Sequence, residues 1–378
     1  MAADHDETGH GGVLTAATMT VLAVSLAKVA SEPATAPDKH GASHPYATRA
    51  DGATVGTTKS GLLGRVDLYQ QERRPMAFIV GVIKKFGDDR ASRLAALIAY
   101  YGFFSIFPAM LALVTVLGFA LEGNDDLRDR ISDSALAQFP VIGSKISDQV
   151  NQPLTGNTIA LVVGVLGAVW AGMAAMQAAQ DAMNEVWDVP RTRYPNFAMK
   201  RLRSVAMLLL ILIGLAASST ISQLAVNVVS GVLATVALFV ATAACNTVMY
   251  LVAFRLLTVA KLTWRQVLPG AVAAGIGYTA LQVVGTLYIT HTLKGAQETY
   301  GTFAVVIGLL SWIYLIAQLT MFAAEANVVA ARHEWPRSLF TPAATSADER
   351  TVAAQATENT MDPEESVSVS FDDRRVKR

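Results

Sequence analysis

A single acidic residue at the end of the last long apolar segment is the strongest candidate for chemistry in this sequence. Glu325 directly follows the apolar run Phe303–Ala324, and Asn327 stands two residues further on. The C-terminal end of a helix carries the negative pole of the helix dipole and disfavours a carboxylate. Ionisable groups kept at membrane depth are functional candidates. We favour a structural or cavity-lining ion pair over proton coupling, because a group so near the interface can reach water.

Glu325 needs a cation if it is to stay charged in an apolar setting. Arg93, Arg203 and Arg255 border the same end of the apolar segments and are the candidate ion-pair partners. The alternative is a glutamate that extends into lipid headgroups. Asn327 could satisfy a backbone carbonyl that the helix end leaves free.

The first long apolar segment contains a second group of candidates around one proline. Pro108 removes an amide donor inside the expected helix and frees the carbonyl of Phe104, so a kink is expected there. Ser105 is placed to help satisfy the backbone. Tyr100 and Tyr101 are neighbours about 100° apart on a helix, so one should face other helices and one lipid. We expect interhelical hydrogen bonds from these tyrosines rather than contact with a substrate.

Uncharged polar residues recur within the middle apolar segments. Such side chains usually face other helices and hydrogen-bond across them, although they could instead line a polar cavity for a substrate. The candidates are Ser219, Gln223, Asn246 and Gln282.

Catalytic and metal-binding motifs are not found in the sequence. Four of the six histidines lie before residue 45, and His291 and His333 fall on opposite predicted membrane faces. Cys245 is the single cysteine and lies in an apolar run, which excludes a cysteine-based zinc site. There is also no phosphate-binding Gly-Lys-Ser/Thr motif. We therefore expect no enzyme activity, no metal, no cofactor and no ATPase in this chain.

The elements that must position these residues are membrane-spanning helices. Hydrophobic residues make up 52% of the chain and charged residues only 16%, below the roughly 25% of soluble domains. A spanning helix needs about 20 mostly apolar residues. Six stretches qualify, at Leu94–Leu121, Thr158–Met176, Val205–Val228, Val232–Leu256, Val267–Ile289 and Phe303–Ala324. The predicted fold is an all-α, polytopic bundle of six transmembrane helices.

Basic residues in the connecting segments set the orientation of this bundle. They are dense before the first span, after the second and after the fourth, whereas the 122–157 loop is rich in Asp and Glu and the loop after the fifth span offers only Lys294. Because cytoplasmic loops carry the excess of Lys and Arg, both ends of the chain are predicted to lie inside. The expected location is the bacterial cytoplasmic (inner) membrane.

The ends of the chain differ in composition from its centre. Residues 1–62 are predicted to be a largely disordered cytoplasmic tail, 63–337 the membrane domain, and 338–378 a disordered, charged tail. The apolar run Val13–Ala30 lacks the basic flank of a signal peptide and is interpreted as a non-spanning segment.

Short amphipathic helices are predicted beside the spans. Pro75 suits a first helical turn, and apolar residues recur at helical spacing to Phe86. With Lys84 and Lys85, this helix is expected either to lie on the anionic cytoplasmic leaflet or to pack on neighbouring protein. A second such helix is expected at Gln177–Trp187, continuing the second span.

Motifs in the first and last spans resemble those of a known family. The first span contains Ala-Tyr100-Tyr101-Gly-Phe-Phe-Ser105-Ile-Phe-Pro108, and the last ends in Glu325-Ala-Asn327. This pair resembles the YihY/BrkB family of bacterial inner-membrane proteins over roughly Asp67 to Arg332. The resemblance implies a six-helix membrane protein, and its members have been described as virulence factors, envelope-lipid-related transporters or, in older usage, tRNA-processing ribonucleases.

A transporter or envelope-lipid-handling protein is the function that these features favour. Its expected partners are the lipid bilayer and a lipid or small anionic substrate, with no nucleic acid; a homo-oligomer is compatible with the sequence. A non-transporting membrane scaffold is the alternative, followed by a tRNA-processing ribonuclease.

Overall fold

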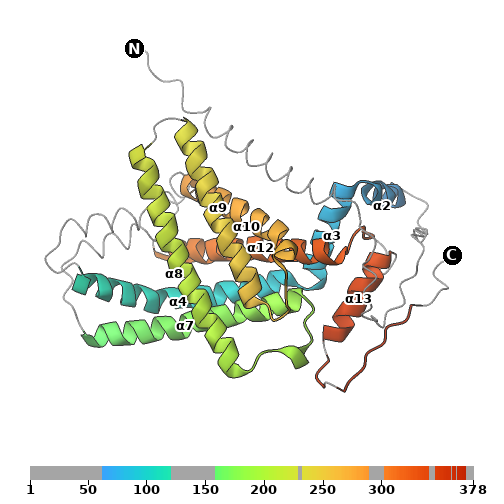
Figure 1. The fold of residues 1–378 in the computed structure, drawn as a ribbon, viewed down its shortest axis with the longest axis horizontal. Coiled ribbons are helices and arrows are strands. Elements are labelled where there is room, and N and C mark those ends of the chain that lie inside the picture. Colours follow the sequence, from blue (N-terminus) through green and yellow to red (C-terminus); the bar gives the residue numbers. More distant parts are fainter. Residues whose placement is uncertain are drawn as a thin grey trace, which may run out of the picture. The chain divides into compact units, whose positions relative to one another are not determined.

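The computed structural model describes residues 62–120, 158–228, 232–288, 302–339, 345–358, 360–362 and 364–371. Within these ranges the chain is all-helical, with nine α-helices, one short 3₁₀-helix and no strand (Figure 1). The predicted all-α class is confirmed. The Val13–Ala30 segment, the remainder of the predicted N-terminal tail before Leu62 and the acidic 122–157 loop lie outside the described residues.

The described chain divides into two compact units. The bundle unit comprises the described residues within Arg90–Asn184 and Pro195–Ala324, and the charged unit comprises the described residues within Met1–Asp89, Glu185–Tyr194 and Glu325–Arg378.

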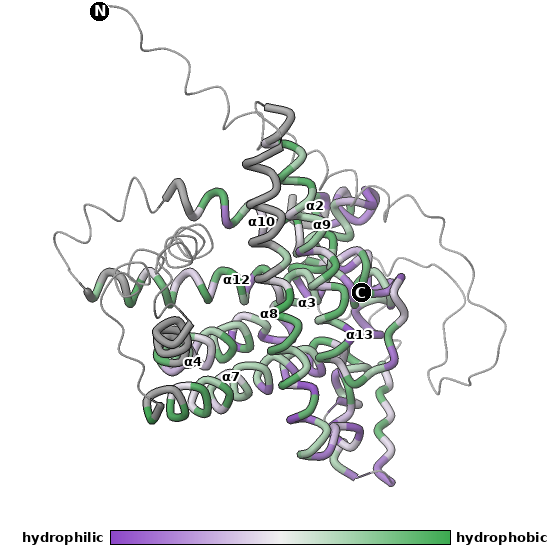
Figure 2. The backbone as a smooth tube through the Cα atoms, turned by 60° about the vertical axis from the view of Figure 1, so that its left-hand side comes forward, coloured by the Kyte–Doolittle hydropathy of each residue, from purple (hydrophilic) through white to green (hydrophobic). Residues whose placement is uncertain are grey.

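Long helices make up the bundle unit. They are α4 (Ala91–Ala120), α7 (Thr158–Val186), α8 (Phe197–Val228), α9 (Val232–Leu257), α10 (Trp264–Tyr288) and α12 (Thr302–Arg332). α9 packs on both α8 and α10. These helices are mainly apolar along their length, whereas α2 and α13 carry more hydrophilic residues (Figure 2). Four candidate membrane spans are found among the described residues, at Val162–Val186, Thr235–Leu257, Trp264–Gly285 and Val306–Arg332. The spans at α4 and α8 remain predictions.

Small residues let the helices of the bundle unit approach closely. A Cβ added at Gly275 of α10 would lie 2.6 Å from the backbone nitrogen of Thr247 in α9. A Cβ at Gly277 would meet Leu319 of α12 at 2.8 Å, and one at Gly167 of α7 would meet Pro108 of α4 at 3.1 Å. Close packing through small residues is the usual way that helices associate in lipid.

The charged unit is built from α2 (Leu62–Glu72), α3 (Arg74–Asp88), the C-terminal end of α12 and α13 (Ser346–Glu358). α3 begins with a proline in its first turn, as the sequence predicts. Its Phe78 and Val82 are buried against Val329, and the Phe78 ring meets Trp335 edge-on at 6.3 Å. One face of α3 thus packs on neighbouring protein, while Ile79 and Ile83 stay exposed, and contact of that second face with the cytoplasmic leaflet stays a prediction.

α13 lies in the segment for which composition alone predicts a disordered tail. The helix is 13 residues long and buries Asp348 and Thr351. Its other buried residues are the alanines Ala347 and Ala353, so no pattern of large apolar side chains marks the helix in the sequence. The second predicted amphipathic helix is also present, since α7 continues without a break to Val186.

Candidate functional site

Lys85 is the largest fully buried side chain in the described part of the chain. It follows Phe78 and Val82 on the packed face of α3 and has no exposed surface. Its ammonium group forms an ion pair with Asp89 one turn later and with Asp188, at 3.4 Å. It also donates to the carbonyl of Val186 at 3.3 Å. Lys85 is therefore a buried cation that joins α3 to the end of α7, and it does not face lipid headgroups.

Asp188 receives a second cation. Arg332, at the end of α12, pairs with the other carboxylate oxygen of Asp188, donates to the carbonyl of Trp187 at 2.5 Å and lies 3.7 Å from Glu334. The backbone of Asp188 has a φ of 43°, a left-handed conformation that Asp tolerates better than most residues. That turn directs its side chain between the two cations.

Glu325 is buried without a hydrogen bond. Its exposed fraction is 0%, and neither carboxylate oxygen has a hydrogen-bond partner among the described residues. The charges that act on it come from Lys85, Asp89, Asp188 and Glu334. Buried polar atoms are almost always paired, so a carboxyl group with two unpaired oxygens requires an explanation.

These side chains form what we call the buried charge cluster: Lys85, Asp89, Asp188, Glu325, Arg332 and Glu334. It contains two cationic groups and four acidic groups, which come from α3, the turn after α7, α12 and the turn after α12. With every group ionised the cluster would carry an excess of negative charge in a buried setting, which is costly unless it is compensated.

The ionisation of the cluster is strongly perturbed. Burial by itself lowers the pKa of Lys85, but the carboxylates of Glu325, Asp188, Asp89 and Glu334 outweigh it and raise that pKa above its ordinary value. Lys85 is therefore charged at any physiological pH. Burial raises the pKa of Asp89 to about 6, although Lys85 opposes the shift. Asp89 thus titrates closer to neutral pH than an exposed aspartate does.

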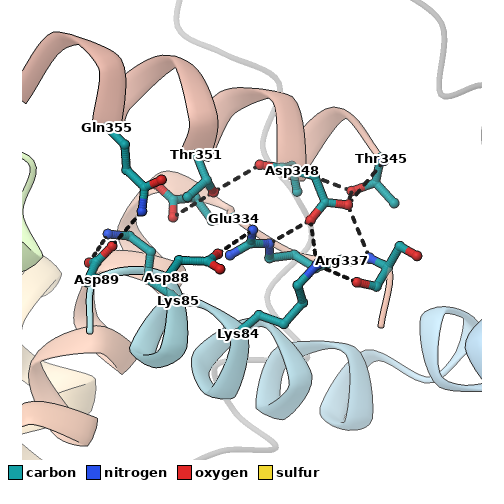
Figure 3. Close-up of polar contacts among 12 residues, drawn as sticks. Lys84, Lys85, Asp88, Asp89, Glu334, Arg337, Thr345, Asp348, Thr351 and Gln355 are labelled. Atoms are coloured by element: carbon teal, nitrogen blue, oxygen red, sulfur yellow. Dashed lines mark hydrogen bonds and ion pairs between the residues drawn. The ribbon is translucent and has the colours of Figure 1, made fainter. Parts of the chain in front are cut away.

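α13 covers the cluster with polar side chains that point toward α3 (Figure 3). Gln355 donates to Asp89 at 2.8 Å, and Thr351 donates to Glu334 at 3.2 Å. Both acceptors belong to the buried charge cluster, so α13 supplies hydrogen bonds to two of its four acidic groups.

Asp348 anchors the start of α13. Its carboxylate accepts from Arg337 at 2.8 Å and from Lys84 at 3.3 Å, and it accepts from the backbone amide of Thr345 at 3.2 Å. The Thr345 hydroxyl in turn accepts from the Asp348 amide at 3.1 Å, which makes the pair a capping box. Burial would raise the pKa of Asp348, but the hydrogen bond from Arg337 and the charge of Lys84 hold it below its usual value.

The segment that follows α12 toward α13 is also hydrogen-bonded to α2. Asp67 accepts from the hydroxyl of Ser338 at 2.8 Å and from the amide of Leu339 at 2.9 Å, and Gln70 donates to the carbonyl of Arg337 at 2.7 Å. The described part of this segment, which ends at Leu339, is therefore hydrogen-bonded to α2, α3 and α13.

The candidates in α4 belong to the bundle unit. Ser105 donates to the carbonyl of Gly102 at 2.7 Å, rather than to the Phe104 carbonyl that Pro108 leaves free. Tyr100 and Tyr101 are 54% and 40% exposed and their rings pack on each other, so the expected burial of one of them is not found among the described residues. Exposed aromatic rings on a long apolar helix are suited to lipid contact.

Of the four polar candidates in the middle helices, the structure describes the side chains of two, Asn246 and Gln282. Asn246 of α9 donates to Thr279 of α10 at 2.9 Å, as expected for an interhelical contact. Gln282 is half-buried in α10. Ser219 and Gln223 lie in α8, but their side chains are outside the described residues.

Tyr314, which no sequence pattern marked as a candidate, forms an interhelical hydrogen bond between α12 and α4. Tyr314 shares a hydrogen bond with Ser92 at 2.7 Å and accepts one from Gln318, whose amide also reaches Ser92 at 3.1 Å.

The three arginines named as partners of Glu325 belong to the bundle unit and have other contacts there. Arg203 donates to the carbonyl of Thr258 at 3.4 Å, and Arg255 lies 4.0 Å over the ring of Trp264. Arg93 is exposed. The cation that acts on Glu325 is Lys85.

Sequence reasoning identified Glu325 and Asn327, both with no exposed surface, but missed Asp89 and Asp188. One signal was present for the cluster: Lys85 and Asp89 are four residues apart, the spacing of an ion pair along a helix. Asp188 gave no such signal. Within the residues that the structure describes, no three His, Cys, Asp or Glu side chains are arranged to hold a metal ion.

Comparison with known proteins places most of this chain in one group. The profile of a family described as Virulence factor BrkB matches residues 82–347. The putative ribonuclease-like protein YfkH of Bacillus subtilis is 26% identical over 67% of this chain and 95% of its own length. The inner membrane protein YhjD of Escherichia coli is 22% identical over 70% and 85%, and a UPF0761 membrane protein of Nitrosospira multiformis is 24% identical over 66% and 62%. No solved structure matches.

Proposed function

The chain belongs to the Virulence factor BrkB family of membrane proteins, and we propose that it moves a lipid or a small anionic solute across the bacterial inner membrane without an ATPase of its own. In this proposal the chain crosses the membrane six times with both ends inside. The four candidate spans found among the described residues and the long helices α4 and α8 support that number.

The observation that carries the proposal is the state of Glu325. It lies in a candidate span, has no exposed surface, and has no hydrogen bond to either carboxylate oxygen from the described residues. A residue with a purely structural role would be expected to have its hydrogen bonds satisfied. An ionisable group kept at membrane depth at such a cost is typical of sites on a substrate or ion pathway.

Reconstituted vesicles test the proposal. Purified protein in vesicles of mixed anionic and zwitterionic lipid would be assayed for lipid scrambling and for anion efflux, each against protein-free vesicles. We expect wild type to accelerate one of the two, and Glu325→Gln to lower that rate by about tenfold or more, the equivalent of about 1.4 kcal/mol. Asp181→Asn is the matched control, because Asp181 is a half-exposed carboxylate paired with Lys200. Vesicles in which wild type accelerates neither process would contradict the proposal.

A non-transporting scaffold is the second candidate, and the paired polar side chains of the bundle unit favour it. Asn246 bonds with Thr279, and Ser92 bonds with Tyr314 and Gln318. Side chains that are satisfied by each other are suited to holding helices together rather than to binding a solute. A scaffold would leave both vesicle assays at background while Glu325→Gln and Ser105→Ala support growth and envelope integrity as wild type does.

The ribonuclease alternative rests on the name of the Bacillus subtilis relative. Hydrolysis of RNA needs an acid–base pair or metal ligands that RNA can reach. We expect the purified chain to leave tRNA precursors intact with and without added Mg²⁺. Metal-dependent cleavage that is lost on substitution of one residue would establish the enzyme instead.

A further inference from the structure

The buried charge cluster has more acidic groups than it has cations, and its members are unequally satisfied. Asp188 forms ion pairs with both Lys85 and Arg332. Asp89 forms an ion pair with Lys85 and accepts a hydrogen bond from Gln355. Glu334 lies 3.7 Å from Arg332 and accepts from Thr351. Glu325 has electrostatic neighbours but no hydrogen bond from the described residues. Glu325 is thus the group on which the excess negative charge falls.

A metal cation does not fit this arrangement. A bound cation such as Ca²⁺ or Mg²⁺ takes about six oxygen ligands, supplied in part by several carboxylates at once. Here the oxygens of Asp89 and Asp188 already accept from Lys85, Arg332 and Gln355. A proton requires only one oxygen, and it would remove the charge that has no partner.

We propose that Glu325 is a proton-binding site, and that Lys85 is the fixed cation whose charge Glu325 shares with Asp89 and Asp188 when the proton is released. The proton leaves the carboxyl oxygen of Glu325 for water and no other bond is broken. While the proton is bound, the charge of Lys85 is divided between Asp89 and Asp188, which is the arrangement of its contacts in the structure. After release, Glu325 competes for the same ammonium group, and the contacts of Lys85 with α3 and with the turn after α7 weaken.

The surroundings of Glu325 determine how far its titration is coupled to its neighbours. From α3 it faces Lys85 and Asp89, from the turn after α7 Asp188, and from the turn after α12 Glu334. The next groups outward are Arg332 on Asp188, Arg350 near Glu334, Glu358 near Asp89, and Glu185 near Glu358. Burial together with the acidic neighbours Glu185, Asp188 and Asp89 raises the pKa of Glu358 to about 7. Glu358 therefore binds a proton in a pH range next to that of Asp89.

Proton binding would give the proposed transporter its coupling ion, and in that sense the inference rests on the proposed function. The binding itself does not, because it can be measured on purified protein with no gradient and no substrate. A protein that binds the proton but moves nothing would refute the proposed transport and leave this site in place. A protein that transports but shows no protonated Glu325 would refute this site and leave the proposed transport in place.

Infrared difference spectroscopy tests the site directly. The full-length protein in lipid nanodiscs would be titrated from acidic to alkaline pH, and the carbonyl-stretch band of protonated carboxylic acids would be recorded at each step. We expect a band that shifts on ¹³C-labelling of glutamate, and Glu325→Gln should remove intensity equal to one carboxyl group per chain. Asp181→Asn should leave the band unchanged, since that carboxylate is half-exposed and paired with Lys200.

Three results would overturn the inference. The first is a band that shifts only on labelling of aspartate, which needs no variant and so holds even if Glu325→Gln fails to fold. The second is a folded Glu325→Gln protein with the full wild-type band. The third is a titration midpoint that moves when Na⁺ is replaced by a bulky organic cation, which would assign the site to a metal cation.

Discussion

The Nζ atom of Lys85 lies 3.4 Å from a carboxylate oxygen of Asp188, a residue 103 positions further along the chain. Both side chains are almost completely excluded from solvent, at 0% and 1% exposure. The pair joins α3 to the turn that follows a candidate span, and Arg332 approaches the same carboxylate from α12. Three separate segments of the chain thus meet at one buried ion pair.

Replacing Lys85 by Met should strongly destabilise the protein. Methionine has a similar length but no charge, so Asp89 would lose its only ion-pair partner in the described chain and Asp188 one of its two. Removing one partner of a buried ion pair typically costs about 3–5 kcal/mol. The free energy of unfolding in a denaturant titration of detergent-solubilised protein measures the loss. Lys261→Met, at an exposed position, should change it by less than about 0.5 kcal/mol. Equal stabilities for the two variants would contradict a compensating role for Lys85.

Asp89 should make stability depend on pH. Its folded-state pKa of about 6 exceeds its ordinary value of 3.8, so the folded protein binds the proton more tightly than the unfolded chain. The free energy of unfolding should therefore fall as pH rises from about 4 to about 6, by up to about 1.4 kcal/mol per pH unit. Asp89→Asn keeps an acceptor for Gln355 and should flatten this slope. Glu358 contributes a slope of the same sign toward pH 7, so some dependence should remain. An unchanged slope in Asp89→Asn would exclude this residue as its source.

Asp348→Asn should loosen α13. The asparagine keeps one acceptor oxygen, but its amide nitrogen would face the donors at Ser338 and Thr345. Each buried donor left unpaired costs about 1–3 kcal/mol. We expect hydrogen exchange of the α13 amides to become at least about tenfold faster. Glu349→Gln removes the neighbouring charge without touching these bonds and should exchange as wild type does. If the two variants exchange alike, Asp348 is not the anchor.

Two helical glycines should respond oppositely to alanine. At Gly275 an added Cβ would lie 2.6 Å from the backbone nitrogen of Thr247, and backbone cannot move aside cheaply, so α9 and α10 must separate. We expect the free energy of unfolding, measured by thermal denaturation of Gly275→Ala, to fall by about 1–3 kcal/mol. At Gly87 of α3 nothing lies within 4 Å of the added atom. There, alanine should be neutral or stabilising by up to about 1 kcal/mol. A stable Gly275→Ala protein would show that the close approach of α9 and α10 is not required.

The hydrogen bond between Asn246 and Thr279 should contribute modestly to the free energy of unfolding. Bonds of this kind between membrane helices average about 0.6 kcal/mol in double-mutant cycles. The cycle Asn246→Ala, Thr279→Val and the double variant measures this coupling through their unfolding free energies. A coupling near zero would mean that each side chain finds another partner when the first is lost.

The regular parts of the fold could be predicted from the sequence because they depend on local patterns. The start of α3 follows from Pro75 and from apolar residues at helical spacing, and the length of α7 follows from an apolar stretch continued by an amphipathic one. Asn246 was expected to bond across helices because an amide in an apolar helix has few other partners. Each of these inferences needs only residues that are close together in the chain.

The partners of the charged residues could not be predicted in the same way. Lys84 and Lys85 are adjacent and look equivalent, yet Lys85 has no exposed surface whereas Lys84 is 22% exposed. The difference arises from Asp188, Glu325 and the segments that fold over α3, and no local pattern encodes such distant contacts. For the same reason three arginines were named as partners of Glu325 in place of Lys85. α13 was missed because its buried residues are two alanines, an aspartate and a threonine, so no large apolar side chain marks its packed face.

The members of the buried ion pair are synthesised at different times, because they lie far apart in the sequence. Lys85 and Asp89 leave the ribosome almost together and can neutralise each other at once, since they are one helical turn apart. Asp188 is synthesised 103 residues later, and Arg332 another 144 residues after that. At about 5–20 residues per second, Asp188 waits roughly 7–29 seconds for its second cation. The nascent chain must keep this carboxylate near water or near Lys85 during that interval.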